Sequence, residues 1–510
     1  MRVRMAKATQ ETELKYEASP GAALPDLRGL PHVASQSEPE VVRLEATYHD
    51  TATFDLARVG ITLRHRTGGT DAGWHLKVPR GRDERTELRL PPGGGLPEEF
   101  ADLLTARVRG RPLRPVATIT TRRRLCTLAD AAGTPVAEVA LDTVTAEALG
   151  HTALLTRWDE IEVELAEGVE YGRDLLKAAD RRLRHSGLKR AQHRMKLEVA
   201  LAGELAGTPS AAEPARPSSA GEAVVAYLRG QLEELLHRDL LVRRDEPDAI
   251  HTMRVAARRM RAALQEFRRL FRGAEAENIV GGLRWLGEEL GHARDEEVLC
   301  DLLVTQLDQV PVESRLGPVQ ARIVGHFAPR MAAAKANLTT VLGSERYMTL
   351  LDNLEALVAD PPLVTDAEER ATSVLPHLVR RSQRRVNRRM RTASDLSTGS
   401  ARDSALHEAR KAAKRARYAA EAASPVVGKP ARKSAKALKN LQSVLGDHHD
   451  AVIAAEALRV LAIRANDAGE SSFTYGLLYE RQAERAACLA VQAERQWKRA
   501  ARRKRTRWMR

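Results

Sequence analysis

The chain has 510 residues, and its 82 lysines and arginines against 68 aspartates and glutamates give it a formal net charge of +14. Its three cysteines lie far apart, at Cys126, Cys300 and Cys488, which excludes a disulfide framework and indicates a reducing, cytoplasmic compartment. No apolar run is long enough to span a bilayer, and no apolar segment follows the basic start, so we expect neither a membrane span nor a signal peptide.

The first predicted strand, residues 6–17, contains Glu11-Thr12-Glu13-Leu14-Lys15. Since successive side chains of a strand point to opposite faces, Glu11, Glu13 and Lys15 share one face. Like charges two residues apart are costly unless a cation or opposite charges compensate them. Taken alone, this alternation is typical of a solvated strand face that carries a salt bridge.

Similar alternation recurs along the first 204 residues. After a proline-rich loop at 18–40, strands are predicted near 43–50, 52–57, 60–67, 73–79, 84–90, 115–128, 134–145 and 157–166, with helices near 97–109 and 168–186. Several strands carry charge at every second position, as in Glu160, Glu162 and Glu164. An open sheet would expose that face to water, whereas a closed barrel would enclose it as a lumen. Carboxylates gathered there would bind a hard divalent cation, and arginines and lysines would bind phosphate oxygens.

Residues 205–220 are rich in Ala, Pro, Gly and Ser and predict a flexible linker between two domains, 1–204 and 221–510. The positive charge belongs to the second domain, because residues 1–220 carry 32 basic and 31 acidic residues, whereas residues 221–510 carry 50 and 37. Such an excess indicates an anionic partner, namely nucleic acid, a lipid surface or a phosphate polymer.

The second domain has helical periodicity and contains a repeat. Residues 251–261 align with 407–417 without a gap, and a Leu-Gly segment ending in Asp295 aligns with one ending in Asp450. A narrow stripe of one helix in each copy carries His251, Arg254, Arg258 and Arg261, or His407, Arg410, Lys414 and Arg417. Arg259 and Arg415 also correspond, and a further basic row includes Arg384 and Arg388. The alternative, a solvated helix face, is weaker for duplicated rows than for a single row.

Segments of the first domain together resemble the CYTH domain of the triphosphate tunnel metalloenzymes. Residues 11–15 match its ExExK signature, and further segments match in the family's order: Tyr48-His49-Asp50-Thr51, Leu63-Arg64-His65-Arg66, Leu76-Lys77 and Arg85-Thr86-Glu87. Met195-Lys196-Leu197 stands where the family has Ser-Lys, without the serine. The resemblance covers roughly residues 5–202. It implies an eight-stranded antiparallel tunnel barrel with flanking helices, and metal-dependent hydrolysis of a triphosphate.

The resemblance also implies roles for single residues. Glu11, Glu13 and Lys15 would be catalytic. Carboxylates would hold Mg²⁺ or Mn²⁺, namely Glu11, Glu13, Glu87, Asp142, Glu162 and Glu164. Cations would grip the phosphate chain, namely Lys15, Arg64, Arg66, Lys77, Arg85, Arg122, Arg124 and Lys196. Asp142 could equally be a turn residue, and Arg122 or Arg124 an exterior one, because the residues alone do not determine that strand's register.

The helical repeat resembles the CHAD domain, a module often found beside CYTH domains. The matching landmarks are His251-Thr252-Met253-Arg254-Val255, the second copy from His407, and the two Leu-Gly segments. The resemblance covers roughly residues 221–500. It implies two pseudo-symmetric four-helix bundles and a basic channel in which the duplicated rows bind inorganic polyphosphate. The basic end, residues 498–510, would add to that site or form a tail.

The sequence is compatible with three functions. The first is metal-dependent hydrolysis of inorganic triphosphate or a related triphosphate, with polyphosphate binding by the helices, in the cytoplasm or at polyphosphate granules. The second is a non-catalytic adaptor that targets such granules. Nucleic-acid binding is disfavoured, because aromatic residues for base stacking make up only 4% of the chain and no groove-reading motif occurs. The paired carboxylates favour hydrolysis, and no residue singles out adenine as an adenylate cyclase would require.

Overall fold

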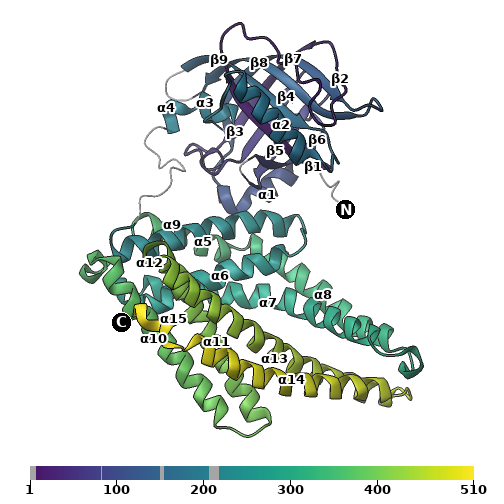
Figure 1. Cartoon of the computed structure of the whole chain (residues 1–510), viewed down its shortest axis with the longest axis vertical. Coiled ribbons are helices and arrows are strands. Elements are labelled where there is room, and N and C mark those ends of the chain that lie inside the picture. The colour runs from purple at the N-terminus through teal and green to yellow at the C-terminus, as the bar shows by residue number, and fades with distance from the viewer. Residues whose placement is uncertain (1–6, 82, 150–153, 194, 206–216, 510) are drawn as a thin grey trace. The chain divides into compact units, whose positions relative to one another are not determined.

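A computed structural model describes residues 7–509 except 82, 150–153, 194 and 206–216 (Figure 1). The chain divides into two compact units, residues 1–212 and 213–510. The predicted linker, residues 205–220, lies largely outside the described residues. No helix in the described part of the chain is long and apolar enough to cross a membrane.

The first unit is a closed antiparallel barrel of eight long strands, as predicted. Their order around the barrel is β1–β6–β5–β4–β3–β7–β8–β9, and pairing of β9 with β1 closes it. The strands are β1 (Lys7–Ala18), β3 (Glu40–Asp50), β4 (Thr62–Thr67), β5 (Gly73–Pro79), β6 (Glu84–Leu90), β7 (Arg114–Ala129), β8 (Pro135–Ala148) and β9 (Leu154–Leu165). The two-residue strands β2 (Ser35–Gln36) and β10 (Lys189–Arg190) pair with β7 and β1.

The segment after β3 differs from the prediction of a strand at 52–57. It is a turn that leads into the 3-10 helix η1 (Ala57–Val59). The buried carboxylate of Asp50 accepts hydrogen bonds from the backbone N–H groups of Leu56 at 3.0 Å and Ala57 at 2.8 Å. A side chain that satisfies backbone donors in this way favours a turn over a strand. Asp50 therefore has a structural role in the Tyr48–Thr51 segment.

The outer face of β1, β8 and β9 is apolar and is covered by helix α2 (Gly172–His185). Leu14 and Ile161 pack there in one buried cluster with Leu175 and Ala179 of α2. Because side chains alternate along a strand, burying this outer face turns the charged residues of the same strands inward. The apolar cluster therefore sets the register that gives the barrel a charged lumen. Helix α1 (Glu98–Val108) follows β6.

Part of the barrel wall is apolar and packs against the short helix α3 (Lys196–Ala200), which precedes α4 (Ala202–Leu205). Ala46, Ile119 and Val144 form a buried cluster there with Leu197 of α3. Lys196, the first residue of α3, lines the lumen. The packing of α3 therefore places in the lumen a lysine that belongs to a helix and not to a strand.

The second unit is helical. The first repeat includes α5 (Ala220–Arg243), α6 (Ala249–Glu266), α7 (Glu275–Asp308), α8 (Val319–Gly343) and α9 (Glu345–Ala359). The second includes α10 (Ala371–Ser394), α11 (Ser400–Ala422), α12 (Ser424–Val427), α13 (Lys429–Asp467) and α14 (Phe473–Ala500). Shorter elements are η2 (Arg268–Leu270), η3 (Val312–Ser314), η4 (Thr365–Glu368), α15 (Arg503–Thr506) and η5 (Arg507–Met509).

The two repeats share their cores as well as their sequence pattern. Helix α6 of the first repeat packs against its counterpart α11. One apolar cluster joins α7, α8, α13 and α14 and includes Leu303, Phe327, Leu458 and Tyr475. The basic C-terminal end is folded onto α13, where Trp508 Nε1 donates a hydrogen bond to Ser434 Oγ at 2.8 Å. This end is therefore part of the helical unit and not a separate tail.

Candidate functional site

Strand register determines which charges meet in the lumen. On the β1–β9 pair, Lys15 stands directly opposite Glu162, and Glu13 stands directly opposite Glu164. Opposed residues on antiparallel strands have Cβ atoms about 4.5–5.5 Å apart, so their side chains interact. The register therefore creates one cross-strand ion pair, with 2.5 Å between Lys15 Nζ and Glu162 Oε1, beside one pair of like charges.

The lumen forms a cavity of about 640 Å³. It brings together most of the residues that the sequence predicted for this site, namely Glu11, Glu13, Lys15, Arg64, Arg66, Lys77, Arg85, Glu87, Glu162, Glu164 and Lys196. Arg85 lies 3.9 Å from Glu13. Segments far apart in the chain thus supply a single charged chamber.

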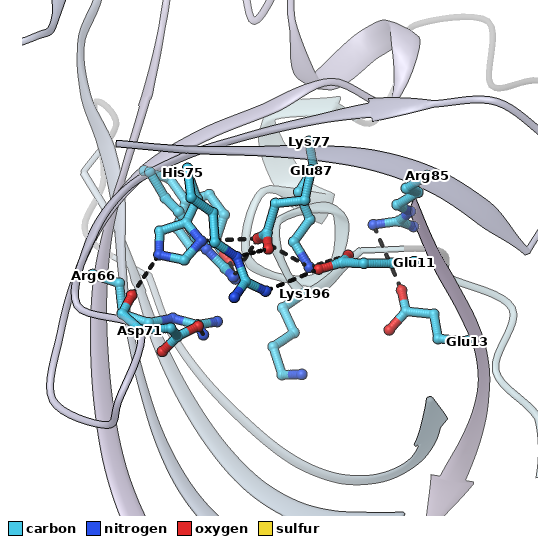
Figure 2. A network of polar contacts seen from close by, with 12 residues as sticks. Glu11, Glu13, Arg66, Asp71, His75, Lys77, Arg85, Glu87 and Lys196 are labelled. Atoms are coloured by element: carbon cyan, nitrogen blue, oxygen red, sulfur yellow. Dashed lines mark hydrogen bonds and ion pairs between the residues drawn. The ribbon is translucent and has the colours of Figure 1, made fainter. Parts of the chain in front are cut away.

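Glu87 is the centre of one network of polar contacts in the lumen (Figure 2). Its Oε1 lies 2.8 Å from His75 Nδ1, 3.4 Å from Lys77 Nζ and 3.4 Å from Arg64 Nη2. Lys77 also pairs with Glu11 at 2.5 Å. Burial alone would raise the pKa of Glu87, but Lys77, His75 and Arg64 hold it far below its usual value. Glu87 is therefore an ionised carboxylate that orients the surrounding cations.

Lys196 is the centre of a second network. Its Nζ lies 2.9 Å from Asp142, 2.7 Å from Glu160 and 2.7 Å from Glu162. Burial alone would lower the pKa of Lys196, but these carboxylates raise it well above its usual value, so the ammonium is charged. Asp142, Glu160 and Glu162 each offer an oxygen within 4.8 Å of the others, a donor set that suits a hard divalent cation. Here the lysine neutralises that set.

Glu164 is a buried carboxylate of the lumen without a directly paired cation among the described residues. In the part of the chain that the structure describes, no hydrogen bond or ion pair reaches it. Burial raises the pKa of Glu164 to about 7, and Glu11 and Glu13 add to this effect against the opposing charge of Lys77. Burial likewise raises the pKa of Glu11. Like-charged, buried oxygen donors of this kind fit a divalent cation, which would compensate them.

The charged residues of the lumen include some that were not predicted, among them Arg89, which pairs with Glu87 and Glu11, and Asp71 and His75. The Nε2 atom of His75 lies 2.7 Å from the backbone oxygen of Asp71, and the Asp71 carboxylate lies 2.5 Å from Arg66 Nη1 (Figure 2). His75 precedes Lys77 by two residues on β5, so strand alternation could have identified it. Asp71 enters from the hairpin between β4 and β5, and no periodicity predicts the direction of a loop side chain.

The register of β7 differs from the prediction by one residue. Arg123 lines the lumen, where it pairs with Asp142 at 2.7 Å and also with Glu162. Arg122 is exposed, and Arg124 donates a hydrogen bond to the backbone oxygen of Ala22 at 2.7 Å. Three consecutive arginines carry no alternation, so only the pairing of β7 with its neighbours decides which one faces inward. Asp142, by contrast, is a buried strand residue and not a turn residue.

The helical unit has a basic pocket of about 440 Å³ between α6, α7 and α11. Of the predicted polyphosphate-binding residues, it is lined by Arg254, Arg258, Arg261, His407, Lys414 and Arg415. Arg254 pairs with Asp295 at 2.5 Å, and the counterpart Arg410 lies 4.0 Å from Asp450. A Cβ added at Gly291 would lie 3.0 Å from Arg254 Nη2, so the glycine of the Leu-Gly segment makes room for a guanidinium.

The remaining predicted residues of the helical unit lie elsewhere. Arg259 and Arg417 flank the ring of Tyr418 and pair with Glu421. Arg384 and Arg388 are exposed on α10. His251 is exposed on α6 and is not among the residues that line the pocket.

Comparison with known proteins agrees with this architecture. A family model of the CYTH domain matches residues 9–192, and one of the CHAD domain matches residues 226–459. "Uncharacterized protein Rv2226" of Mycobacterium tuberculosis (strain H37Rv) is 38% identical over 498 residues, which covers 95% of either chain.

Two solved structures are also similar to parts of the chain. PptA from Streptomyces chartreusis is 22% identical with a TM-score of 0.47, covering 55% of this chain and 100% of that one. The CHAD domain from the plant Ricinus communis is 28% identical with a TM-score of 0.45, covering 56% and 93%. From its two domain matches and its full-length relative, the chain belongs to the family of proteins in which a CYTH domain is fused to a CHAD domain.

Proposed function

We propose that this protein hydrolyses inorganic triphosphate, or a related triphosphate, in the lumen of its barrel, and that its helical domain binds inorganic polyphosphate. The observation that carries the proposal is the cavity of about 640 Å³ in which buried cations and carboxylates from many strands converge. A linear triphosphate carries oxygens along its whole length, and arginine and lysine bind such oxygens through charge-assisted hydrogen bonds. A buried, preorganised set of this kind is suited to a reaction that moves negative charge.

In this proposal the lumen cations bind and orient the substrate. Arg64, Arg66, Lys77, Arg123 and Lys196 contact phosphate oxygens and stabilise the charge that develops as the P–O bond breaks. Their carboxylate partners keep them ionised and in position before the substrate enters. The phosphate chain then replaces some of these carboxylates as the partner of each cation.

Lys15 serves as a hydrogen-bond donor to a phosphate oxygen or to the attacking water. Burial alone would lower the pKa of Lys15, but Glu13 and Glu162 raise it, so the ammonium keeps its proton. This argues against Lys15 as a general base. Glu11, Glu13 and Glu164 would hold Mg²⁺ or Mn²⁺, which when bound supplies charge neutralisation on the terminal phosphate and lowers the pKa of water.

Phosphate release from tripolyphosphate tests the barrel half of the proposal. With Mg²⁺ or Mn²⁺ we expect turnover that EDTA abolishes and that a Glu11→Gln/Glu13→Gln variant lowers by about 100-fold or more. Glu17→Gln is the matched control, because Glu17 also lies on β1 but is exposed and lies outside the lumen lining. Turnover no greater than that of the double variant would eliminate hydrolysis and leave a polyphosphate-binding adaptor.

Competition at fixed salt tests the helical half. We expect long-chain inorganic polyphosphate to displace duplex DNA from the whole chain, because Tyr418, the tyrosine among the residues that line the basic pocket, is buried and offers no free ring face for stacking on bases. Equal or stronger binding of DNA would contradict polyphosphate as the partner.

A further inference from the structure

The two helical repeats share a basic pattern, but their structures differ at one pair of counterparts, Arg261 and Arg417. Arg261 lines the basic pocket, and within the described residues no hydrogen bond or ion pair reaches its guanidinium. Burial lowers the pKa of Arg261, and the nearby Arg415, Arg284 and Arg258 lower it further. This guanidinium is therefore surrounded mainly by charges of its own sign, and the carboxylate of Glu288, which also lines the pocket, opposes them only in part.

Arg417 in the second repeat is neutralised by its neighbours. Its Nε donates a hydrogen bond to Glu421 at 2.7 Å, and its Nη1 donates one to Gln442 Oε1 at 3.1 Å. In the first repeat the position of Gln442 is occupied by Gly287, and that of Glu421 by Gln265. Because of these two sequence differences, the guanidinium of Arg417 has hydrogen-bond partners, whereas that of Arg261 has none among the described residues.

The cations around Arg261 repel one another. Arg258 donates a hydrogen bond to the hydroxyl oxygen of Tyr418 at 3.0 Å. Burial lowers the pKa of Lys414 to about 6, and Arg258 and Arg410 contribute to this shift, so Lys414 keeps its positive charge at neutral pH only when an anion compensates it. Partly buried charges of one sign are costly to maintain unless an anion compensates them. The carboxylate of Asp295, which also lines this pocket, is already paired with Arg254.

We infer that inorganic polyphosphate binds on one side of the repeat pair only, in the pocket of Arg258, Arg261, Lys414 and Arg415, and that Gln442 and Glu421 close the equivalent position in the second repeat. The inference rests on the proposed polyphosphate binding, and it adds a location and an asymmetry. The duplicated sequence suggests a symmetric pair of sites, but the side chains of the two repeats are arranged asymmetrically.

A matched pair of substitutions in the full chain tests the inference. Binding of long-chain inorganic polyphosphate is measured in EDTA, which prevents metal-dependent hydrolysis. We expect Arg261→Gln to weaken binding about tenfold or more, and Arg417→Gln to weaken it less than about twofold, because among the described residues Arg417 has hydrogen-bond partners and Arg261 has none. The Tm should move the opposite way: Arg417→Gln lowers it, because Glu421 and Gln442 lose a partner, and Arg261→Gln does not.

A second variant, Gly287→Gln, places in the first repeat the glutamine that the second repeat has at position 442. The nearest atom to a Cβ added at Gly287 is Arg261 Nη1, at 3.9 Å, so the helix accommodates the substitution. We expect Gly287→Gln to weaken polyphosphate binding without lowering the Tm, because glutamine has a higher helix propensity than glycine. Equal losses in the Arg261 and Arg417 variants, or no loss in either, would overturn the asymmetry. Failure of the unaltered chain to bind polyphosphate would instead overturn the proposed function.

Discussion

The pKa of Glu164 depends on its surroundings in the barrel. It stands directly opposite Glu13, and burial raises its pKa to about 7. A carboxyl group whose folded-state pKa lies above its usual 4.5 binds more protons in the folded protein than in the unfolded chain between those two values. The free energy of unfolding that this group contributes therefore falls as the pH rises from about 4.5 to about 7.

Replacing Glu164 by glutamine removes this cost. At pH 8 in EDTA we expect Glu164→Gln to raise the Tm of the barrel by roughly 3 °C or more, whereas at pH 4.5 the two proteins should differ little. Added Mg²⁺ should stabilise the unaltered chain more than the variant. Differential scanning calorimetry at the two pH values checks this, and identical Tm values at pH 8 would contradict the assignment of an uncompensated charge to Glu164.

In strand β7, a shift of the register by one residue changes which arginine faces the lumen. Arg123 pairs with Asp142 in the lumen, and Arg122 is exposed beside it. Both residues are arginines of the same strand, so they form a natural comparison.

We expect Arg123→Gln to lower tripolyphosphate turnover about 100-fold, because it removes a cation of the lumen, whereas Arg122→Gln should leave turnover within about twofold. Arg123→Gln should also lower the Tm, since the carboxylate of Asp142 would lose one of its two partners. Equal effects of the two substitutions on turnover would show that the register of β7 does not govern the site.

Helix α3 links packing to the site, because the buried Leu197 directly follows Lys196 in the chain and holds that lysine in place. We expect Leu197→Ala to lower the free energy of unfolding of the barrel by about 2–5 kcal/mol through the cavity that it leaves. The KM for tripolyphosphate should rise as well, because Lys196 is held less firmly. Leu205, only partly buried at the edge of the same cluster, provides the control, and Leu205→Ala should have the smaller effect.

The two units place charge in different surroundings. In the barrel, cations and carboxylates pair in an enclosed lumen, whereas the basic pocket of the helical unit holds several cations and few acids. Salt screens exposed charges more strongly than buried ones.

Raising the salt concentration should therefore separate the two activities of the whole chain. Between about 50 and about 200 mM salt we expect polyphosphate binding to weaken by roughly tenfold or more, since counterions are released when several phosphates are neutralised. Turnover of tripolyphosphate at saturating substrate should change by less than about threefold over the same range. A parallel decline of the two measurements would indicate that both ligands use one site.

The sequence by itself determined the charged strand faces and the helical repeat, and through its resemblance to the CYTH domain it also predicted the closed barrel and most of the lumen residues. Charge at every second position, and duplicated rows at helical spacing, are local patterns that assign a face to each side chain whatever the rest of the chain does. Only the tertiary structure decided that Arg123 faces inward, that Asp71 reaches Arg66 from a hairpin, and that Arg417 is neutralised while Arg261 is not. These outcomes depend on partners that lie far away in the chain, and no local period encodes which distant segments will meet.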